Sequence, residues 1–163
     1  MKKRLSRTGF LFAVCVLTMT GCASASGSGD TAVQPENLTG QELTDAKTMA
    51  AEYMAGFVAG VRSEDFSRFE EAIPSEAKGK VTAEMFRAMC RDLKTNLGEL
   101  TASEYLGELD QTLVRDYLWK LTFEKKSSTP GKEGELLRKQ VVYMVRVGKL
   151  DGVFHIAGSG FRF

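Results

Sequence analysis

The amino-acid sequence predicts one two-layer α+β domain, in which three helices pack on a curved, four-stranded antiparallel sheet, behind an N-terminal export segment. Three observations support this prediction. Apolar residues recur about every four positions as far as Gly98, and every second position beyond it. Turns containing Gly, Pro or Asp divide the later part of the chain into strands. Residues 1–21 have the basic and then apolar pattern of an export signal.

The export segment is too short to be a membrane-spanning helix. Four basic side chains precede an apolar stretch from Gly9 to Thr20 that contains no charged residue. A helix of that length spans roughly 18 Å, whereas the hydrocarbon core of a bilayer is roughly 30 Å thick. Residues 1–21 are therefore predicted to be a cleaved signal peptide.

The apolar stretch ends in TMTGC over residues 18–22, which resembles the lipobox of bacterial lipoprotein precursors. In that family the cysteine thiol accepts a diacylglycerol and the chain is cleaved just before it. The family prefers leucine where this chain has Met19. The resemblance implies that Cys22 is lipidated and holds the protein at a membrane of the cell envelope. Ala23 after the cysteine, in place of aspartate, favours the outer membrane if the cell has one.

An alternative cleavage site lies just downstream. The ASA of residues 23–25 is a small-x-small pattern, and cleavage there would release a soluble protein without Cys22. Under the lipoprotein interpretation, residues 22–38 comprise the lipidated cysteine and a flexible Ser-, Gly- and Ala-rich tether, and residues 39–163 form the single domain. Fifteen residues of such a tether have a root-mean-square span of roughly 20 Å.

Charge and cysteine usage exclude several classes of function. Removal of residues 1–21, which hold four basic and no acidic side chains, leaves a net charge of about −3, so nucleic-acid binding is not expected. Cys90 is then the one thiol of the domain, and we expect it to behave as a small buried hydrophobe. The sequence contains no cluster of Cys and His, so neither a metal site nor a cofactor is predicted.

The first helix is predicted to begin at a capping box. Thr39 is followed three residues later by Glu42, and Leu38 and Leu43 provide the flanking hydrophobic staple. Gly56 and Gly60 further along indicate close packing against another element. The apolar stripe of this helix is formed by Met49, Tyr53, Met54, Phe57, Val58 and Val61.

Two further helices follow. Ser63 is predicted to cap a short helix that continues to Ile73 and is stopped by Pro74. Thr82 is predicted to cap a longer helix that Gly98 ends.

Beyond Gly98 we predict four strands of an antiparallel meander. β-Branched and aromatic residues dominate, and apolar and polar residues alternate. A charged loop at residues 125–134 and an Asp-Gly turn at residues 151–152 close two hairpins. The predicted strands are residues 100–106, 113–124 and 136–147, and a last strand from Val153 onward.

The turn and last strand, GKLDGVFHIAG over residues 148–158, resemble the closing strand of the nuclear transport factor 2-like superfamily. In that superfamily an aromatic residue and an isoleucine two positions later point into a cone between helices and sheet, and Phe154 and Ile156 stand at these places. Residues 57–98 also look similar to small lipoprotein domains of the superfamily. The resemblance covers about residues 41–163. The superfamily includes isomerases, dehydratases and hydrolases as well as noncatalytic binding modules, so the resemblance in fold does not determine the function.

No catalytic residue is predicted. The superfamily's enzymes place an acid or base, commonly Asp or His, inside the apolar cone, where burial shifts its pKa. Asp116 is predicted to point away from the cone, and His155 faces away because Phe154 and Ile156 face inward. The polar or aromatic residues predicted to face inward on the second and third strands include Arg115, Tyr117, Lys139 and Tyr143, with no carboxylate among them.

Two groups of side chains are the candidate sites. Tyr117, Trp119 and Tyr143 could line a small apolar pocket with polar handles, although such a set is also an ordinary core. On the opposite face, Leu118, Val142 and Met144 are more apolar than a solvated sheet requires. These three residues indicate an interface with a second copy or with another envelope protein.

The sequence therefore favours a noncatalytic domain of a membrane-anchored envelope lipoprotein that binds a partner protein or a small apolar ligand. The alternative is an isomerase- or dehydratase-like enzyme that uses the cone.

Overall fold

The computed structural model describes residues 38–111 and 113–162. The predicted signal peptide, the lipidation site Cys22 and the tether up to residue 37 lie outside the described residues. Within the described ranges, no helix combines the length and the apolar character that crossing a membrane requires.

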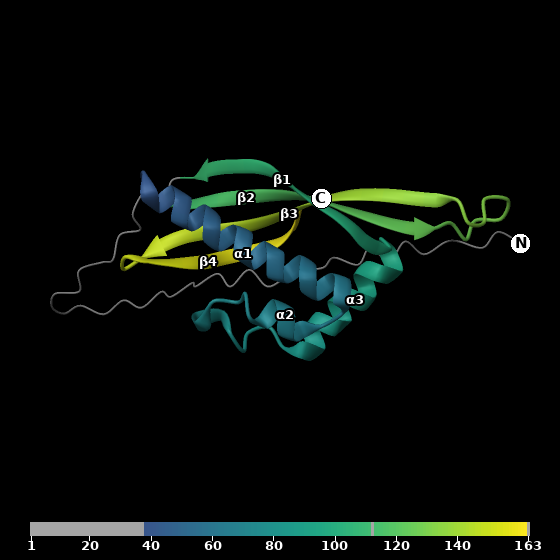
Figure 1. The fold of residues 1–163 in the computed structure, drawn as a ribbon, viewed down its shortest axis with the longest axis horizontal. Coiled ribbons are helices and arrows are strands. Elements are labelled where there is room, and N and C mark those ends of the chain that lie inside the picture. Colours follow the sequence, from purple (N-terminus) through teal and green to yellow (C-terminus); the bar gives the residue numbers. More distant parts are fainter. Residues whose placement is uncertain (1–37, 112, 163) are drawn as a thin grey trace, which may run out of the picture. The chain divides into compact units, whose positions relative to one another are not determined.

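The described chain is an α+β domain in which helices pack on one four-stranded antiparallel sheet, which confirms the predicted fold class (Figure 1). The strands follow one another across the sheet in the order β1-β2-β3-β4. In Figure 1, α1 crosses one face of the sheet, and α2 and α3 lie beside it. The helices are α1 (Gln41–Ser63), α2 (Phe66–Glu70) and α3 (Ala83–Asn96), with a 3₁₀ turn at Ser75–Ala77. The strands are β1 (Glu99–Gln111), β2 (Val114–Lys126), β3 (Leu136–Leu150) and β4 (Val153–Arg162).

The N-terminus of α1 forms half of the predicted capping box. The Glu42 carboxylate accepts a hydrogen bond of 3.2 Å from the backbone N–H of Thr39. The helix nevertheless begins at Gln41, and the residue before it, Gly40, has no side chain that could cap. The predicted cap by the Thr39 hydroxyl is therefore wrong, because the chain enters the helix one residue later.

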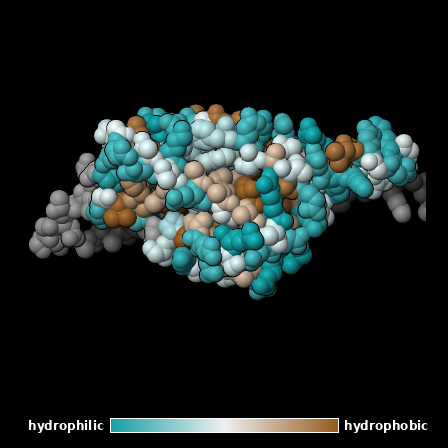
Figure 2. Space-filling model, viewed as in Figure 1, coloured by the Kyte–Doolittle hydropathy of each residue, from teal (hydrophilic) through white to brown (hydrophobic). Residues whose placement is uncertain are grey.

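The helix α1 packs closely, through its two glycines, against α2 and the residues that directly follow it, and close packing at these glycines was predicted. A Cβ on Gly56 would stand 2.3 Å from the Cβ of Ala72, and one on Gly60 would stand 3.0 Å from the Cβ of Phe69. The other side of α1 carries small residues such as Ala51 and Ala55, which are exposed. Figure 2 shows pale brown residues gathered over the middle of this view, where α1 crosses the sheet.

The cap of α2 is Asp65, so the prediction of Ser63 is wrong. The Asp65 carboxylate accepts from the backbone N–H of Ser67 at 3.0 Å. Ser63 is instead the last residue of α1, and its hydroxyl donates to the carbonyl of Ala59 at 2.8 Å. Glu64, in the left-handed region with φ of 53°, ends α1 and separates the two helices.

Both predicted ends of α3 are close to the observed ones. The Thr82 hydroxyl accepts from the backbone N–H of Met85 at 3.2 Å and caps the helix. Gly98 has φ of 106°, and a Cβ there would stand 2.2 Å from the carbonyl oxygen of Glu124. Glycine is therefore required both by the backbone conformation and by the approach of β2.

The sheet is longer than the sequence pattern indicates. β1 continues to Gln111, five residues beyond its predicted end. Two irregularities in its pairing with β2, between Leu100 and Ala102 and between Tyr105 and Gly107, interrupt the alternation. The Asp151-Gly152 turn between β3 and β4 is where it was predicted.

The core lies between the helices and one face of the sheet, which we call the inner face. Tyr53, Met54 and Phe57 of α1 form a single cluster with buried residues of β2 and β3. Phe154 and Ile156 pack against this cluster, as the closing-strand resemblance predicted. The inner-face residues of β2 and β3 in the cluster are Tyr117, Trp119, Leu121, Phe123, Tyr143, Val145 and Val147.

Candidate functional site

The three residues predicted to line a pocket lie together on the inner face and belong to the core. Tyr143 stacks on Phe57 of α1, with 4.5 Å between ring centroids. The Tyr117 side chain is fully buried, and Trp119 is almost so. These contacts place the residues where the sequence predicted. The binding of a ligand by them stays a prediction.

A cluster of three hydroxyl groups joins α1, β3 and β4 inside the core. The Ser159 Oγ lies 2.8 Å from the Tyr53 hydroxyl and accepts a hydrogen bond of 3.1 Å from the Tyr143 hydroxyl. Burial raises the pKa of Tyr53, and it raises that of Tyr143 well above its usual value. Both phenols therefore stay protonated at neutral pH and act as hydrogen-bonding groups rather than as bases.

The sequence did not indicate this cluster. Tyr53 was assigned to the apolar stripe of α1 by its helical spacing. Ser159 faces inward because the pairing of β3 with β4 shifts between Arg146 and Val147, which an alternation pattern alone does not show.

A second polar group lies on the inner face near the turn between β1 and β2. Arg115 forms ion pairs with Glu108 at 2.8 Å and with Asp110 at 3.0 Å. The Tyr105 hydroxyl donates to Glu108 at 3.0 Å, and the Tyr105 ring meets Trp119 edge to face. Burial, followed by the hydrogen bond to Glu108, raises the pKa of Tyr105 to about 12.

The inward orientation of Arg115 agrees with the prediction, but its two carboxylate partners were missed. Both belong to the part of β1 beyond the pairing shift after Tyr105, where the sequence predicted no strand. These carboxylates are ion-paired to Arg115 on β1 and β2, whereas the hydroxyl cluster of Tyr53, Tyr143 and Ser159 joins α1, β3 and β4.

Two lysines of the β2–β3 hairpin contact the C-terminus of α3. Lys139, predicted to face inward, donates to the carbonyl of Asn96 at 3.0 Å, and Lys125 donates to that of Thr95 at 2.6 Å. Both carbonyls belong to the last residues of α3, where cations are favourable. These two lysines therefore cap a helix.

His155 and Cys90, the other reactive side chains considered in the sequence, lie on different elements, β4 and α3. His155 pairs with Gly148 in the register and lies on the side opposite Phe154 and Ile156. Burial raises the pKa of the Cys90 thiol to about 11, as expected of a small buried hydrophobe. In residues 38–111 and 113–162, no three His, Cys, Asp or Glu side chains are grouped so that they could hold a metal ion.

The side of the sheet turned away from the core cluster, which we call the outer face, carries the three residues predicted to form an interface. Leu118 and Met144 are directly paired, and Val142 follows on the same strand. Leu118 and Val142 are half-buried, whereas Met144 is only 7 % exposed. Met144 is buried without belonging to the core cluster, which distinguishes the outer face from the inner one.

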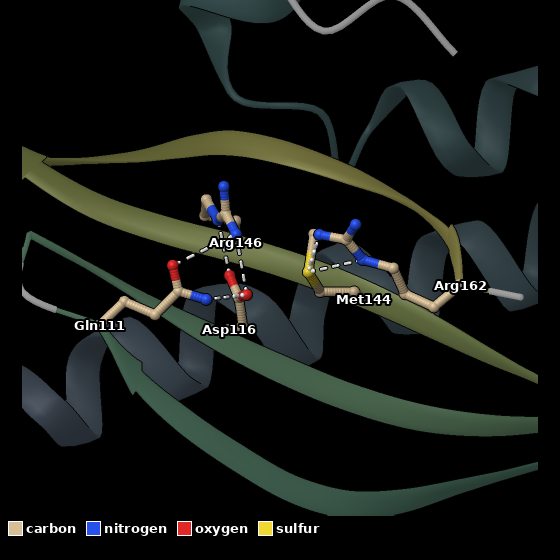
Figure 3. A network of polar contacts seen from close by, with 5 residues as sticks. All are labelled: Gln111, Asp116, Met144, Arg146 and Arg162. Atoms are coloured by element: carbon tan, nitrogen blue, oxygen red, sulfur yellow. Dashed lines mark hydrogen bonds and ion pairs between the residues drawn. The ribbon is translucent and has the colours of Figure 1, made fainter. Parts of the chain in front are cut away.

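Beside these apolar residues, the outer face holds a buried ion pair (Figure 3). Asp116 is 2 % exposed, and its carboxylate accepts from Arg146 through Nε at 2.7 Å and Nη2 at 2.9 Å. Gln111 donates to the same carboxylate at 2.7 Å. The hydrogen bonds to Asp116 raise the pKa of Arg146. The outward direction of Asp116 agrees with the sequence, but its burial and its partners were not predicted.

Arg162, at the end of β4, lies over Met144. Its Nε and Nη2 contact the Met144 sulfur at 3.3 Å and 3.0 Å (Figure 3). Around its apolar centre the outer face therefore holds two guanidinium groups, and among the described residues Arg146 has a carboxylate partner whereas Arg162 has none.

Comparisons with known proteins give similarity of fold only. No protein-family model and no curated protein matches the chain. A SEC-C motif containing protein from Rhodopseudomonas palustris is 14% identical with a TM-score of 0.42, covering 72% of this chain and 85% of that one. TsrD from Streptomyces laurentii is 14% identical with a TM-score of 0.43, covering 71% and 88%. An NTF-2 like protein of unknown function from Shewanella oneidensis MR-1 is 12% identical with a TM-score of 0.39, covering 71% and 97%. Similarity at this level transfers no function.

Proposed function

We propose that this chain is a lipid-anchored protein of the cell envelope whose domain is a noncatalytic binding module for a partner protein. The lipobox-like TMTGC of residues 18–22 supports the anchor, with Cys22 as the acylated residue. Two or three acyl chains hold a protein at a membrane far more firmly than one, so attachment would be effectively permanent. The partner then meets the domain at the membrane surface.

The observation that carries the proposal is the apolar centre of the outer face. Leu118, Val142 and Met144 are contiguous there, on two paired strands. Contiguous apolar surface on a sheet face is typical of a surface that another protein covers.

The charges around this centre are compatible with docking. Lys120 is ion-paired with Glu104 at 2.5 Å, and Arg138 with Glu124 at 2.8 Å. Because these pairs are already neutral, a second protein surface can approach them without strong repulsion.

The inner face gives less support to the alternative functions. An isomerase- or dehydratase-like enzyme needs a positioned acid or base, but the raised pKa values of Tyr53 and Tyr143 make these phenols weak acids. The carboxylates on the inner face, Glu108 and Asp110, are ion-paired with Arg115. A small apolar ligand needs space, but Tyr143 is stacked on Phe57 and Tyr117 is fully enclosed. A partner protein on the outer face is therefore the function that we favour.

The lipid anchor is tested by mass spectrometry of the mature N-terminus. We expect a chain that begins at Cys22 and carries a diacylglycerol. An unmodified chain that begins at Ser26 would contradict the anchor and leave the binding module as a separate question.

Docking is tested by site-specific photo-crosslinking of the full chain in its native membrane. A photoreactive residue at Leu118 is expected to crosslink to a protein, identified by mass spectrometry as a second copy or as another envelope protein. The matched control is Leu136, an exposed leucine on the hairpin away from the apolar centre. Equal crosslinking from the two positions, or crosslinks to lipid alone, would contradict docking on the outer face.

A further inference from the structure

Among the described residues, Arg162 is the arginine of the outer face that has no carboxylate partner. In the part of the chain that the structure describes, both polar contacts of its guanidinium are to the Met144 sulfur. A thioether sulfur is a weak hydrogen-bond acceptor and carries no negative charge. The guanidinium is therefore held against the apolar centre without a strong acceptor.

The outer face of β4, the strand that carries Arg162, leaves room for a segment of a second chain to lie over it. Gly158 and Gly160 lie on the outer face of β4, paired with Arg146 and Met144. Apart from the glycine and its two chain neighbours, no heavy atom of the described residues lies within 4 Å of the place where a Cβ would stand on either glycine. An approaching segment can thus reach the backbone of β4 between the two arginines shown in Figure 3.

We propose that Arg162 recognises a carboxylate of the partner protein, an Asp or Glu side chain flanked by apolar residues. This proposal rests on the docking function proposed above and specifies the chemistry of the partner. A guanidinium forms two parallel hydrogen bonds with a carboxylate, which gives both orientation and binding energy. The flanking apolar side chains would pack on Val142 and Leu118.

The same face argues against a second copy as the partner. The carboxylates of Glu104, Glu124 and Asp116 are each already ion-paired within the face. Two copies joined through this face would bring two Arg162 guanidinium groups together without a free carboxylate from these residues.

The face also argues against an anionic lipid surface. Such surfaces attract clusters of about four to eight Lys or Arg residues. Here Lys120, Arg138 and Arg146 are each neutralised by an acidic neighbour. A single unpaired guanidinium beside apolar side chains fits one carboxylate in a protein segment better.

The experiment uses the full chain with its lipid, purified in detergent micelles, and two end-blocked peptides. The sequences are Leu-Thr-Glu-Thr-Leu and the neutral control Leu-Thr-Gln-Thr-Leu. In an extended peptide the two leucines and the central residue share one face. Binding is followed by nitrogen–proton correlation spectra of the arginine Nε–H groups and of the Gly158 and Gly160 amides.

We expect the Glu peptide to bind about tenfold more tightly than the Gln peptide, because a charge-assisted hydrogen bond contributes about that factor. The Arg162 Nε–H signal should move with it. In Arg162→Gln the preference should fall below about twofold. In the control Arg138→Gln the tenfold preference should remain, since Arg138 is exposed but already paired with Glu124. Thermal melts establish that both variants are folded.

Equal affinities for the two peptides, including no binding of either, would overturn the proposal, as would a preference that survives Arg162→Gln. An Arg162-dependent dimer in sedimentation, or Arg162-dependent binding to phosphatidylglycerol vesicles, would replace the partner by a second copy or a lipid and overturn it as well. The docking function is judged separately by the crosslinks from Leu118. If those crosslinks form but the Glu peptide is not preferred, only the proposed recognition of a carboxylate is contradicted.

Discussion

Asp116 and Arg146 face each other across β2 and β3 and form a two-point ion pair on the outer face of the sheet, at 2.7 Å and 2.9 Å. The aspartate is buried, whereas 31% of the arginine side chain is exposed. A buried carboxylate depends on its partners, because an unpaired charge out of water is strongly unfavourable. The pair therefore fixes the surface on which the proposed partner docks.

The first prediction concerns this pair. Asp116→Asn retains the size of the side chain but leaves Arg146 without its carboxylate, so we expect a loss of about 2 to 3 kcal/mol in the free energy of unfolding. Urea unfolding followed by circular dichroism measures the loss. The control Glu124→Gln breaks the pair with Arg138, whose side chain is exposed, and it should cost less than about 1 kcal/mol. Equal costs for the two variants would show that burial of Asp116 contributes nothing.

The sequence predicted that Asp116 points outward but not that it is buried. The direction follows from the alternation along β2, which is regular. The burial follows from Gln111 and Arg146, which lie on two different neighbouring strands. Their proximity depends on the register of β1 and β3 against β2, and a single sequence pattern does not fix that register.

The second prediction compares Thr39 and Thr82, which the same sequence pattern predicted to be helix caps. Thr82→Ala removes the hydroxyl that accepts from the Met85 N–H, so it should cost about 1 kcal/mol. Thr39→Ala should cost almost nothing, because the residue before α1 is Gly40 and no side chain caps that helix. Urea unfolding measures both. A comparable loss in both variants would restore the capping box predicted for α1.

The caps show where local sequence is sufficient and where it is not. Thr82 was found because its side chain, its backbone and the start of α3 involve one short segment. Ser63 was misassigned because α1 continues through it, and the choice between Ser63 and Asp65 depends on where α1 ends. Packing of α1 against α2 fixes that end, so a pattern in one segment could not reveal it.

The third prediction concerns the contact between α1 and α2. Gly56→Ala places a Cβ 2.3 Å from the Cβ of Ala72 and 3.2 Å from the carbonyl oxygen of Arg68, so the helices must separate. We expect a loss of about 1 to 3 kcal/mol in stability, despite the higher helix propensity of alanine. The control Gly158→Ala adds a Cβ into open space and should be close to neutral. Thermal or urea unfolding measures the difference, and a stabilised Gly56→Ala variant would contradict the close packing.

The sequence pattern did not predict most of the polar groups that face inward. Tyr143 was placed correctly because β3 alternates without interruption in its pairing with β2. Ser159 and Glu108 were not, because each follows a shift in strand pairing that reverses which residues face inward. The outward orientation of Leu118, Val142 and Met144 agrees with the sequence for the same reason, since they belong to the regular central pair of strands.

The last prediction is that alkaline pH unfolds the domain before its tyrosines ionise freely. All four tyrosines of the chain, Tyr53, Tyr105, Tyr117 and Tyr143, have pKa values raised by burial, with Tyr105 and Tyr117 at about 12. Between the usual tyrosine pKa near 10 and these higher values, the folded chain binds more protons than the unfolded chain. Stability is therefore fully present below pH 10 and falls as the pH rises above it. Tyrosinate absorbance and circular dichroism, recorded together in one titration, should change in the same pH range above 10. Tyrosine ionisation near pH 10 with unchanged circular dichroism would show that the phenols of the core are not protected.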